Sequence, residues 1–274
     1  MRLLHSFIYS NFFIATVLLF FTLNTYFFFG LKPDLVYLVF IAFSSLSLYG
    51  IHGIIGLNHI APIHRSNRHD WIARNKLLTW ILVFVSSSVS LIALLSLEIQ
   101  IIVLLIPCVI LGFLYAIPIL GLKRLRDLPY FKIFIISGVV LYLCCIIPVL
   151  GNELSLVFFL ERFLFLIALT IPFDIRDLQI DASNGDKTTA TVLGAQTSTS
   201  IGVVLLFLVI ILNLILLFNA QVNLVYALVQ ISIAAMAILL SMAQLKRNFE
   251  EWHYALAFEG SLLLPGLLLS IYFL

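Results

Sequence analysis

Charged side chains are scarce in this chain of 274 residues. Asp, Glu, Lys and Arg together account for 10% of it, hydrophobic residues account for 63%, and the mean hydropathy is +1.17. Soluble globular domains carry about 25% charged residues, so this composition excludes a water-soluble protein. No polar linker interrupts the apolar runs, and we expect a single domain over 1–274. The formal net charge of +2 gives no reason to expect a nucleic-acid partner.

Cysteine is also scarce. The chain has three cysteines, Cys108, Cys144 and Cys145, and all of them lie inside apolar runs. Their spacing matches neither a disulfide framework nor a zinc site. We therefore expect them to be inert packing residues.

Long apolar runs, in contrast, recur from end to end. A helix of about 20 apolar residues crosses a bilayer, and the sequence predicts an all-α membrane bundle of about nine such helices around an apolar cavity. The first run lacks the small-residue cleavage site of a signal peptide before Gly30, so we expect it to remain as a membrane helix. The expected spans are roughly 6–29, 34–56, 77–96, 99–120, 131–150, 155–173, 198–218, 223–243 and 255–274.

Basic residues are distributed unevenly among the connections between these spans. Apart from Lys32 and Arg162, every Lys and Arg lies near the N-terminus or after an even-numbered span. Membrane proteins keep such residues on the cytoplasmic side. We therefore expect the N-terminus and the polar connections 57–75 and 174–197 to lie in the cytoplasm, with the C-terminus outside, in a bacterial inner membrane. The two connections are predicted to meet above the mouth of the cavity.

Acidic residues gather in one place, the segment Asp174-Ile-Arg-Asp177-Leu-Gln-Ile-Asp181. On one helix these three aspartates occupy positions i, i+3 and i+7 and project from one face. Carboxylates that lie so close together raise one another's pKa unless a cation lies among them. Hard oxygen ligands of this kind suit Mg²⁺, which binds through one or two carboxylates plus substrate phosphate. The alternative is a solvated acidic turn between two helices.

Two basic connections are candidate anion sites. Arg65 and Arg68 lie in the histidine-rich connection after span two, and Lys123 and Arg124 follow span four. These cations are suited to binding a phosphate group, but they equally suit a topology signal in contact with anionic membrane lipids. A metal site formed by His64, His69 and Asp70 is a further alternative, although its spacing matches no strong pattern.

The acidic segment continues to Gly194 and, as a whole, resembles the second aspartate motif of the UbiA-type membrane prenyltransferases. The matching run is Asp174-Ile-Arg-Asp177-Leu-Gln-Ile-Asp181-Ala-Ser-Asn-Gly185-Asp-Lys187-Thr-Thr-Ala-Thr-Val-Leu193-Gly194. Tyr115 with Lys123-Arg124 is similar to a second element of that family, and the layout of nine helices with an inside N-terminus is shared.

The resemblance implies a specific chemistry. Members of this family bind a polyprenyl diphosphate through Mg²⁺ held by aspartate motifs, ionise it, and transfer the prenyl group to a lipophilic acceptor. Asp177 and Asp181 match the family's paired aspartates, with Asp174 one turn earlier. The resemblance assigns diphosphate contacts to Lys123 and Arg124, with help from Lys187, and the basic connection adds Arg65 and Arg68.

One part of the family pattern is missing. If Tyr49 is placed on the family's usual tyrosine, the aspartates of its first motif fall on Gly53, Gly56 and Ile60, and no carboxylate occurs between Asp34 and Asp70. We therefore keep three hypotheses. The first is a prenyltransferase. The second is a catalytically degenerate relative that binds isoprenoid or acts as a complex subunit, and the third is a transporter. The sequence identifies neither the acceptor nor the oligomeric state.

Overall fold

The computed structural model describes residues 2–59, 66–116, 125, 128, 130–247 and 249–273. Within these ranges every regular element is a helix, as the apolar runs predicted. The chain divides into two compact units. The first unit combines Met1–Glu98 with Phe249–Leu274, and the second consists of Ile99–Asn248.

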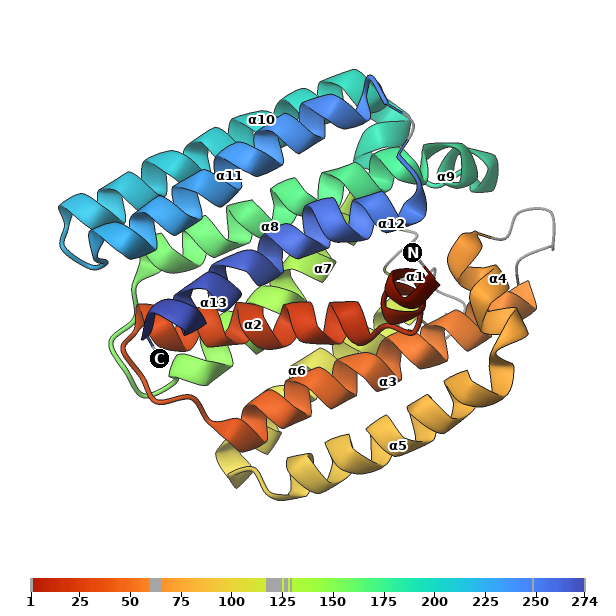
Figure 1. The fold of residues 1–274 in the computed structure, drawn as a ribbon, viewed down its shortest axis with the longest axis horizontal. Helices are drawn as coiled ribbons and strands as arrows, with labels where there is room; N and C mark the ends of the chain where they lie inside the picture. The colour runs from red at the N-terminus through yellow and green to blue at the C-terminus, as the bar shows by residue number, and fades with distance from the viewer. Residues whose placement is uncertain are drawn as a thin grey trace. The chain divides into compact units, whose positions relative to one another are not determined.

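The first unit joins the two ends of the chain. Within it, α2 packs against α3 and α13, and α3 packs against α5 (Figure 1). A Cβ atom at Gly266 would lie 1.9 Å from the carbonyl oxygen of Phe20, so only glycine permits the close approach of α13 to α2. The elements of the first unit are α1 (Arg2–Tyr9), α2 (Phe12–Phe28), α3 (Leu35–His59), α4 (Asn67–Arg74), α5 (Lys76–Leu95), α12 (Glu251–Tyr254), the π-helical turn η5 (Ala255–Glu259) and α13 (Gly260–Phe273).

The second unit is built around α8. This helix packs against α7 and α10, and α10 runs alongside α11 (Figure 1). Ile133 on α7 and Ile167 and Ile171 on α8 form a buried cluster that fixes the start of α7 beside the C-terminal half of α8. The elements are α6 (Ile99–Ala116), α7 (Phe131–Leu141), the π-helical turn η3 (Tyr142–Ile146), the 3₁₀ turn η4 (Ile147–Val149), α8 (Leu156–Arg176), α9 (Leu178–Asn184), α10 (Thr189–Phe218) and α11 (Leu224–Gln244).

Most of the predicted spans are long enough to cross a bilayer. Among the described residues, seven helices pass by length and composition, and α1 with α2 makes an eighth candidate that is bent by 68°. The apolar helix Ile99–Gly112 is shorter than the others, so the count of nine is not confirmed. Large apolar side chains such as Phe84 and Leu156 are exposed on the outer faces, where a bilayer would cover them.

A charged pair lies buried inside the second unit. Glu161 and Arg162 are each 1% exposed, and Arg162 Nε lies 2.5 Å from Glu161 Oε2. Asn213 on α10 donates a hydrogen bond of 2.9 Å to the other Glu161 oxygen. The pairing satisfies two charges that would otherwise be very unfavourable in a membrane span, and it links α8 to α10.

Candidate functional site

The acidic segment spans a helix junction. Asp174 lies in the last turn of α8, which ends at Arg176, and Asp181 lies in α9, which begins at Leu178. Asp177 occupies the junction between the two helices, with φ −88° and ψ 4°. The prediction of three aspartates on one face assumed a single helix, and the break at Asp177 gives its side chain different partners from the other two.

Asp174 and Asp181 converge on one cation, the ammonium group of Lys132. The Lys132 Nζ atom lies 3.0 Å from Asp174 Oδ1 and 3.5 Å from Asp181 Oδ2. Lys132 is the second residue of α7, so this contact joins α7, α8 and α9. Sequence reasoning assigned Lys132 only to the topology signal. The only hint in the sequence was general: clustered carboxylates need a nearby cation, and Lys132 lies at the very start of an apolar span.

Asp177 pairs with its neighbour in the chain. Arg176 Nε donates to Asp177 Oδ1 at 2.7 Å, and Arg176 Nη2 donates to Oδ2 at 2.9 Å. Both side chains are about 30% exposed, and the Arg176 guanidinium also stacks over the Phe173 ring at 5.2 Å. A bidentate pair of this kind fixes the orientation of the carboxylate.

Hydrogen bonds tie the connection from α9 to α10 to the elements that carry this cluster. Gly185 ends α9 with φ 76°, a conformation that favours glycine, and it allows the Asp186 N–H to donate to the carbonyl oxygen of Asp181 at 2.9 Å. Thr188 then caps α10 through a reciprocal capping box with Thr191. The Lys187 carbonyl oxygen accepts a hydrogen bond of 3.0 Å from the Tyr130 N–H, which ties this connection to the start of α7.

Burial and crowding of charge define the electrostatics of the cluster. Asp174 is 2% exposed and Asp181 is 7% exposed. Burial raises the pKa of Asp181, the charges of Asp177, Asp174 and Asp186 raise it further, and Lys132 opposes the shift. Asp174 Oδ2 is buried and has no hydrogen-bond partner among the described residues, while the Thr189 backbone N–H lies close enough to the Asp174 carboxylate to stabilise its charge.

The described side chains fit a divalent ion only as a carboxylate pair. Within the described ranges, no three His, Cys, Asp or Glu side chains converge on a common metal position. Asp174 and Asp181 do converge, on Lys132. Mg²⁺ needs only one or two carboxylates when phosphate and water complete its coordination, and the unpartnered Asp174 Oδ2 is a hard oxygen donor of the required kind.

The predicted cationic residues have different surroundings. Lys187 is exposed and lies in the same connection as Asp186. Arg68 belongs to the first unit, where its Nε lies 3.7 Å from Glu251 Oε1 and its backbone N–H donates to Glu251 Oε2 at 3.0 Å. Arg65, Lys123 and Arg124 lie outside the described residues, so their predicted roles stay predictions.

The region expected to hold the missing first motif is packed with apolar side chains. A Cβ atom at Gly53 would lie 2.5 Å from the Ile72 Cδ1 atom, and Ile72 is fully buried among Ile54 and Val83. A side chain at position 53 would therefore require the Cδ1 end of Ile72 to shift within this core. Gly53 is thus part of the packing of α3 against α4 and α5.

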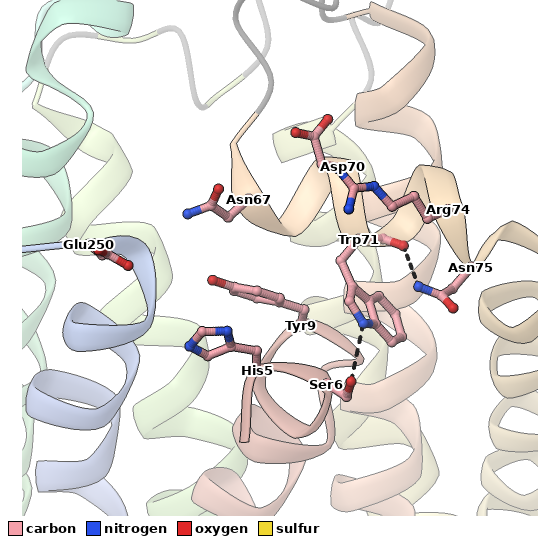
Figure 2. Close-up of a pocket in the computed structure, with 9 residues that line it drawn as sticks. All are labelled: His5, Ser6, Tyr9, Asn67, Asp70, Trp71, Arg74, Asn75 and Glu250. Carbon is pink, nitrogen blue, oxygen red and sulfur yellow. Dashed lines mark hydrogen bonds between the residues drawn. The ribbon is translucent and has the colours of Figure 1, made fainter. Parts of the chain in front are cut away.

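A polar cavity of about 660 Å³ lies elsewhere in the first unit, between α1 and α4 (Figure 2). Trp71 Nε1 donates to Ser6 Oγ at 3.4 Å across it, and Asp70 is among the lining residues. His69 instead contacts Ser66, with 2.8 Å between Nδ1 and Oγ. His64 lies outside the described residues. Among the residues that are described, no three His, Cys, Asp or Glu side chains are placed to hold a metal ion at the alternative His/Asp site.

Comparisons with known proteins agree on one family. Residues 68–262 match the sequence profile of the UbiA prenyltransferase family, whereas no curated protein matches the chain in sequence. A UbiA homolog from Archaeoglobus fulgidus bound to GPP and Mg²⁺ has a similar fold, with a TM-score of 0.66 and 14% identity over 95% of this chain and 98% of that chain. The same homolog bound to DMAPP and Mg²⁺ gives a TM-score of 0.64 and 13% identity over 95% and 98%.

A second homolog shows the same fold without substrate. The apo structure of a UbiA homolog from Aeropyrum pernix K1 matches with a TM-score of 0.63 and 15% identity over 94% of this chain and 98% of that chain. These identities are low, so the structures establish the fold. The matched profile covers well over half of the sequence, and the chain therefore belongs to the UbiA prenyltransferase family of integral membrane proteins.

Proposed function

We propose that this protein is an intramembrane prenyltransferase that moves a prenyl group from a polyprenyl diphosphate to a lipophilic acceptor. The observation that carries the proposal is the convergence of Asp174 and Asp181 on one cation at the end of a membrane span. Buried carboxylates at such a position are unfavourable unless they serve a ligand or a partner. The homolog from Archaeoglobus fulgidus, which shares the fold, was solved with GPP and Mg²⁺ and with DMAPP and Mg²⁺.

The proposed site uses the acidic cluster for the metal and the basic residues for the diphosphate. Asp174 and Asp181 would hold Mg²⁺, which would supply positive charge to the departing diphosphate, and Asp177 would join them only by leaving Arg176. Lys187 would contact the diphosphate in the second unit. Arg65, Arg68, Lys123 and Arg124 are proposed to add further positive charge around it.

The reaction follows from this arrangement of charge. The allylic C–O bond breaks, and its electron pair leaves with the diphosphate. The acceptor then attacks the allylic carbon and loses a proton. Because negative charge accumulates on the diphosphate in the transition state, the cations near it stabilise the transition state more than the ground state.

Turnover by purified protein tests this proposal. The protein is incubated in lipid vesicles with Mg²⁺, prenyl diphosphates of several lengths and a panel of phenol and quinone acceptors, and prenylated product is measured by mass spectrometry. Product that disappears in the Asp181→Asn variant is the expected result. If no acceptor gives product while isoprenoid still co-purifies with the protein, the enzyme proposal is rejected in favour of the second candidate below.

The second candidate is a degenerate member that binds isoprenoid or acts as a complex subunit without catalysis. The packing at Gly53 favours it, because Ile72 fills the space that a carboxylate of the first motif would need. The two candidates share the fold and differ only in turnover. In either case we propose that the N-terminus faces the cytoplasm of a bacterial cell and the C-terminus the outside.

A further inference from the structure

The acidic cluster carries its own cations. Four aspartates, at 174, 177, 181 and 186, lie within thirteen residues of sequence. Arg176 pairs with Asp177, and Lys132 bridges Asp174 and Asp181. The two buried carboxylates thus share one ammonium group that comes from α7, more than forty residues earlier in the chain.

We propose that Lys132 is an internal counter-cation that makes the site take up a divalent metal ion together with diphosphate rather than alone. The competition between Lys132 and the metal ion rests on the observed contacts alone. The contact between Lys132 and diphosphate rests on the proposed prenyl diphosphate substrate. Lys132 thereby becomes a ligand-positioning residue that neither the family assignment nor the sequence pattern identifies.

The geometry explains why the metal ion and the ammonium compete. Mg²⁺ binds carboxylate oxygens at about 2.0–2.1 Å, so an ion held by Asp174 Oδ1 and Asp181 Oδ2 would take the place of Lys132 Nζ, which lies 3.0 and 3.5 Å from these two oxygens. Without diphosphate, a metal ion entering there displaces the ammonium and leaves it without its partners. That cost weakens metal binding.

Diphosphate removes this cost. A lysine ammonium has three donors on a flexible stem, and the base of the Lys132 stem is fixed because Ile133 is buried in the α7–α8 core and the Tyr130 N–H is bonded to the Lys187 carbonyl oxygen. The ammonium can therefore turn from the carboxylates to a phosphate oxygen without movement of α7. Metal and diphosphate then each favour the binding of the other, as reciprocal coupling requires.

The unpartnered oxygen of Asp174 is the second observation. Asp174 is 2% exposed, and its Oδ2 atom is buried with no hydrogen-bond partner among the described residues, while Oδ1 faces Lys132. Lys132 thus uses only one oxygen of this carboxylate. The other oxygen is a second point of attachment for a metal ion that takes the place of the ammonium between Asp174 and Asp181.

Metal binding without diphosphate is the decisive measurement. Mn²⁺ is titrated into the purified wild-type protein and the Lys132→Met variant in detergent, and free Mn²⁺ is followed by electron paramagnetic resonance. We expect Lys132→Met to bind Mn²⁺ about tenfold more tightly than wild type, in the usual range of coupling between two sites. Lys246→Met is the matched control, since Lys246 is exposed and forms no ion pair within the described ranges, and it should bind Mn²⁺ as wild type does.

Diphosphate binding must change in the opposite direction. With Mg²⁺ present, Lys132→Met should bind geranyl diphosphate about tenfold more weakly than wild type, whereas Lys132→Arg should retain most of the affinity. A lysine with a purely structural role would weaken both metal and diphosphate binding. Unchanged or weaker Mn²⁺ binding in Lys132→Met therefore overturns the proposal.

Two further results separate this inference from the proposed function. If wild type binds no geranyl diphosphate while Lys132→Met still gains Mn²⁺ affinity, the counter-cation role stands and the prenyl diphosphate substrate is rejected. If Lys132→Met does not fold because Asp174 is left buried and unpaired, Lys132→Gln gives the same test, since its amide can still donate to Asp174 without charge.

Discussion

At the scale of single residues, the site depends on how three aspartates share two cations. Asp174 and Asp181 use Lys132, and Asp177 uses Arg176. The sequence predicted the aspartates and their role as a group. It did not predict that Asp177 would turn to its own neighbour, because the helix break between α8 and α9 is not visible in the spacing of the residues.

Loss of one carboxylate should remove metal-dependent ligand binding. Asp177→Asn and Asp181→Asn each replace a charged, hard ligand by an amide of nearly the same shape. We expect each variant to lose Mg²⁺-dependent binding of geranyl diphosphate by at least tenfold, which corresponds to about 1.4 kcal/mol, as measured by isothermal titration calorimetry. Asp34→Asn is the control, because Asp34 caps the start of α3 in the first unit. If both Asp177→Asn and Asp181→Asn bind geranyl diphosphate as wild type does, the cluster is a solvated turn with no role in metal binding.

The raised pKa of Asp181 predicts how stability depends on pH in chelator. A carboxyl group whose pKa is higher in the folded than in the unfolded protein stabilises the fold below its unfolded pKa, and that contribution is lost as pH rises through the folded pKa. As the pH rises above 3.8, the ordinary pKa of an aspartate, the wild-type protein should therefore lose stability relative to Asp181→Asn. The measurement is the unfolding midpoint Tm of both proteins from pH 4 to pH 7 in EDTA. A difference in Tm that stays constant with pH would contradict the expectation.

At the scale of helices, buried polar side chains hold the second unit together. Glu161 and Arg162 on α8 form a pair that is removed from solvent, and Asn213 on α10 binds the same carboxylate. Both residues lie inside the span predicted at 155–173. The structure shows that they pair and that α10 supplies a third member.

Breaking this pair should destabilise the protein strongly. Removal of one partner from a buried ion pair costs about 3–5 kcal/mol, because the remaining charge is left unpaired. We therefore expect Arg162→Met to lower the stability by this amount, measured by reversible unfolding in mixed detergent. The double variant Arg162→Met with Glu161→Gln leaves no isolated charge and should recover most of the loss. Equal stability of the single and double variants would show that the pair contributes little.

At the scale of the whole molecule, the arrangement of charge predicts the orientation in the membrane. The basic connections are expected in the cytoplasm and the C-terminus outside. Single cysteines placed at Asn219 and Ser183, in a background in which the three native cysteines are changed to Ala, report the side of each connection. Asn219→Cys should react with a membrane-impermeant thiol reagent added to intact cells, and Ser183→Cys only after the membrane is opened. The reverse pattern would invert the topology and place the acidic cluster outside the cell.

The membrane class, the helical fold and the acidic segment could be read from the sequence, since they rest on local patterns. Apolar runs of sufficient length require helices in a bilayer, and the run from Asp174 to Gly194 carries the family resemblance. The absence of a carboxylate between Asp34 and Asp70 was equally visible. These features depend on residues that are near one another in the chain.

Tertiary structure alone decided which residues meet. Lys132 reaches Asp174 and Asp181 because the apolar faces of α7 and α8 pack through Ile133, Ile167 and Ile171, and no spacing in the sequence encodes that approach. Likewise, only the packing of α3 against α4 shows that Ile72 fills the space beside Gly53. Side-chain pairs far apart in the chain are set by the packing of whole helices, which local periodicity does not specify.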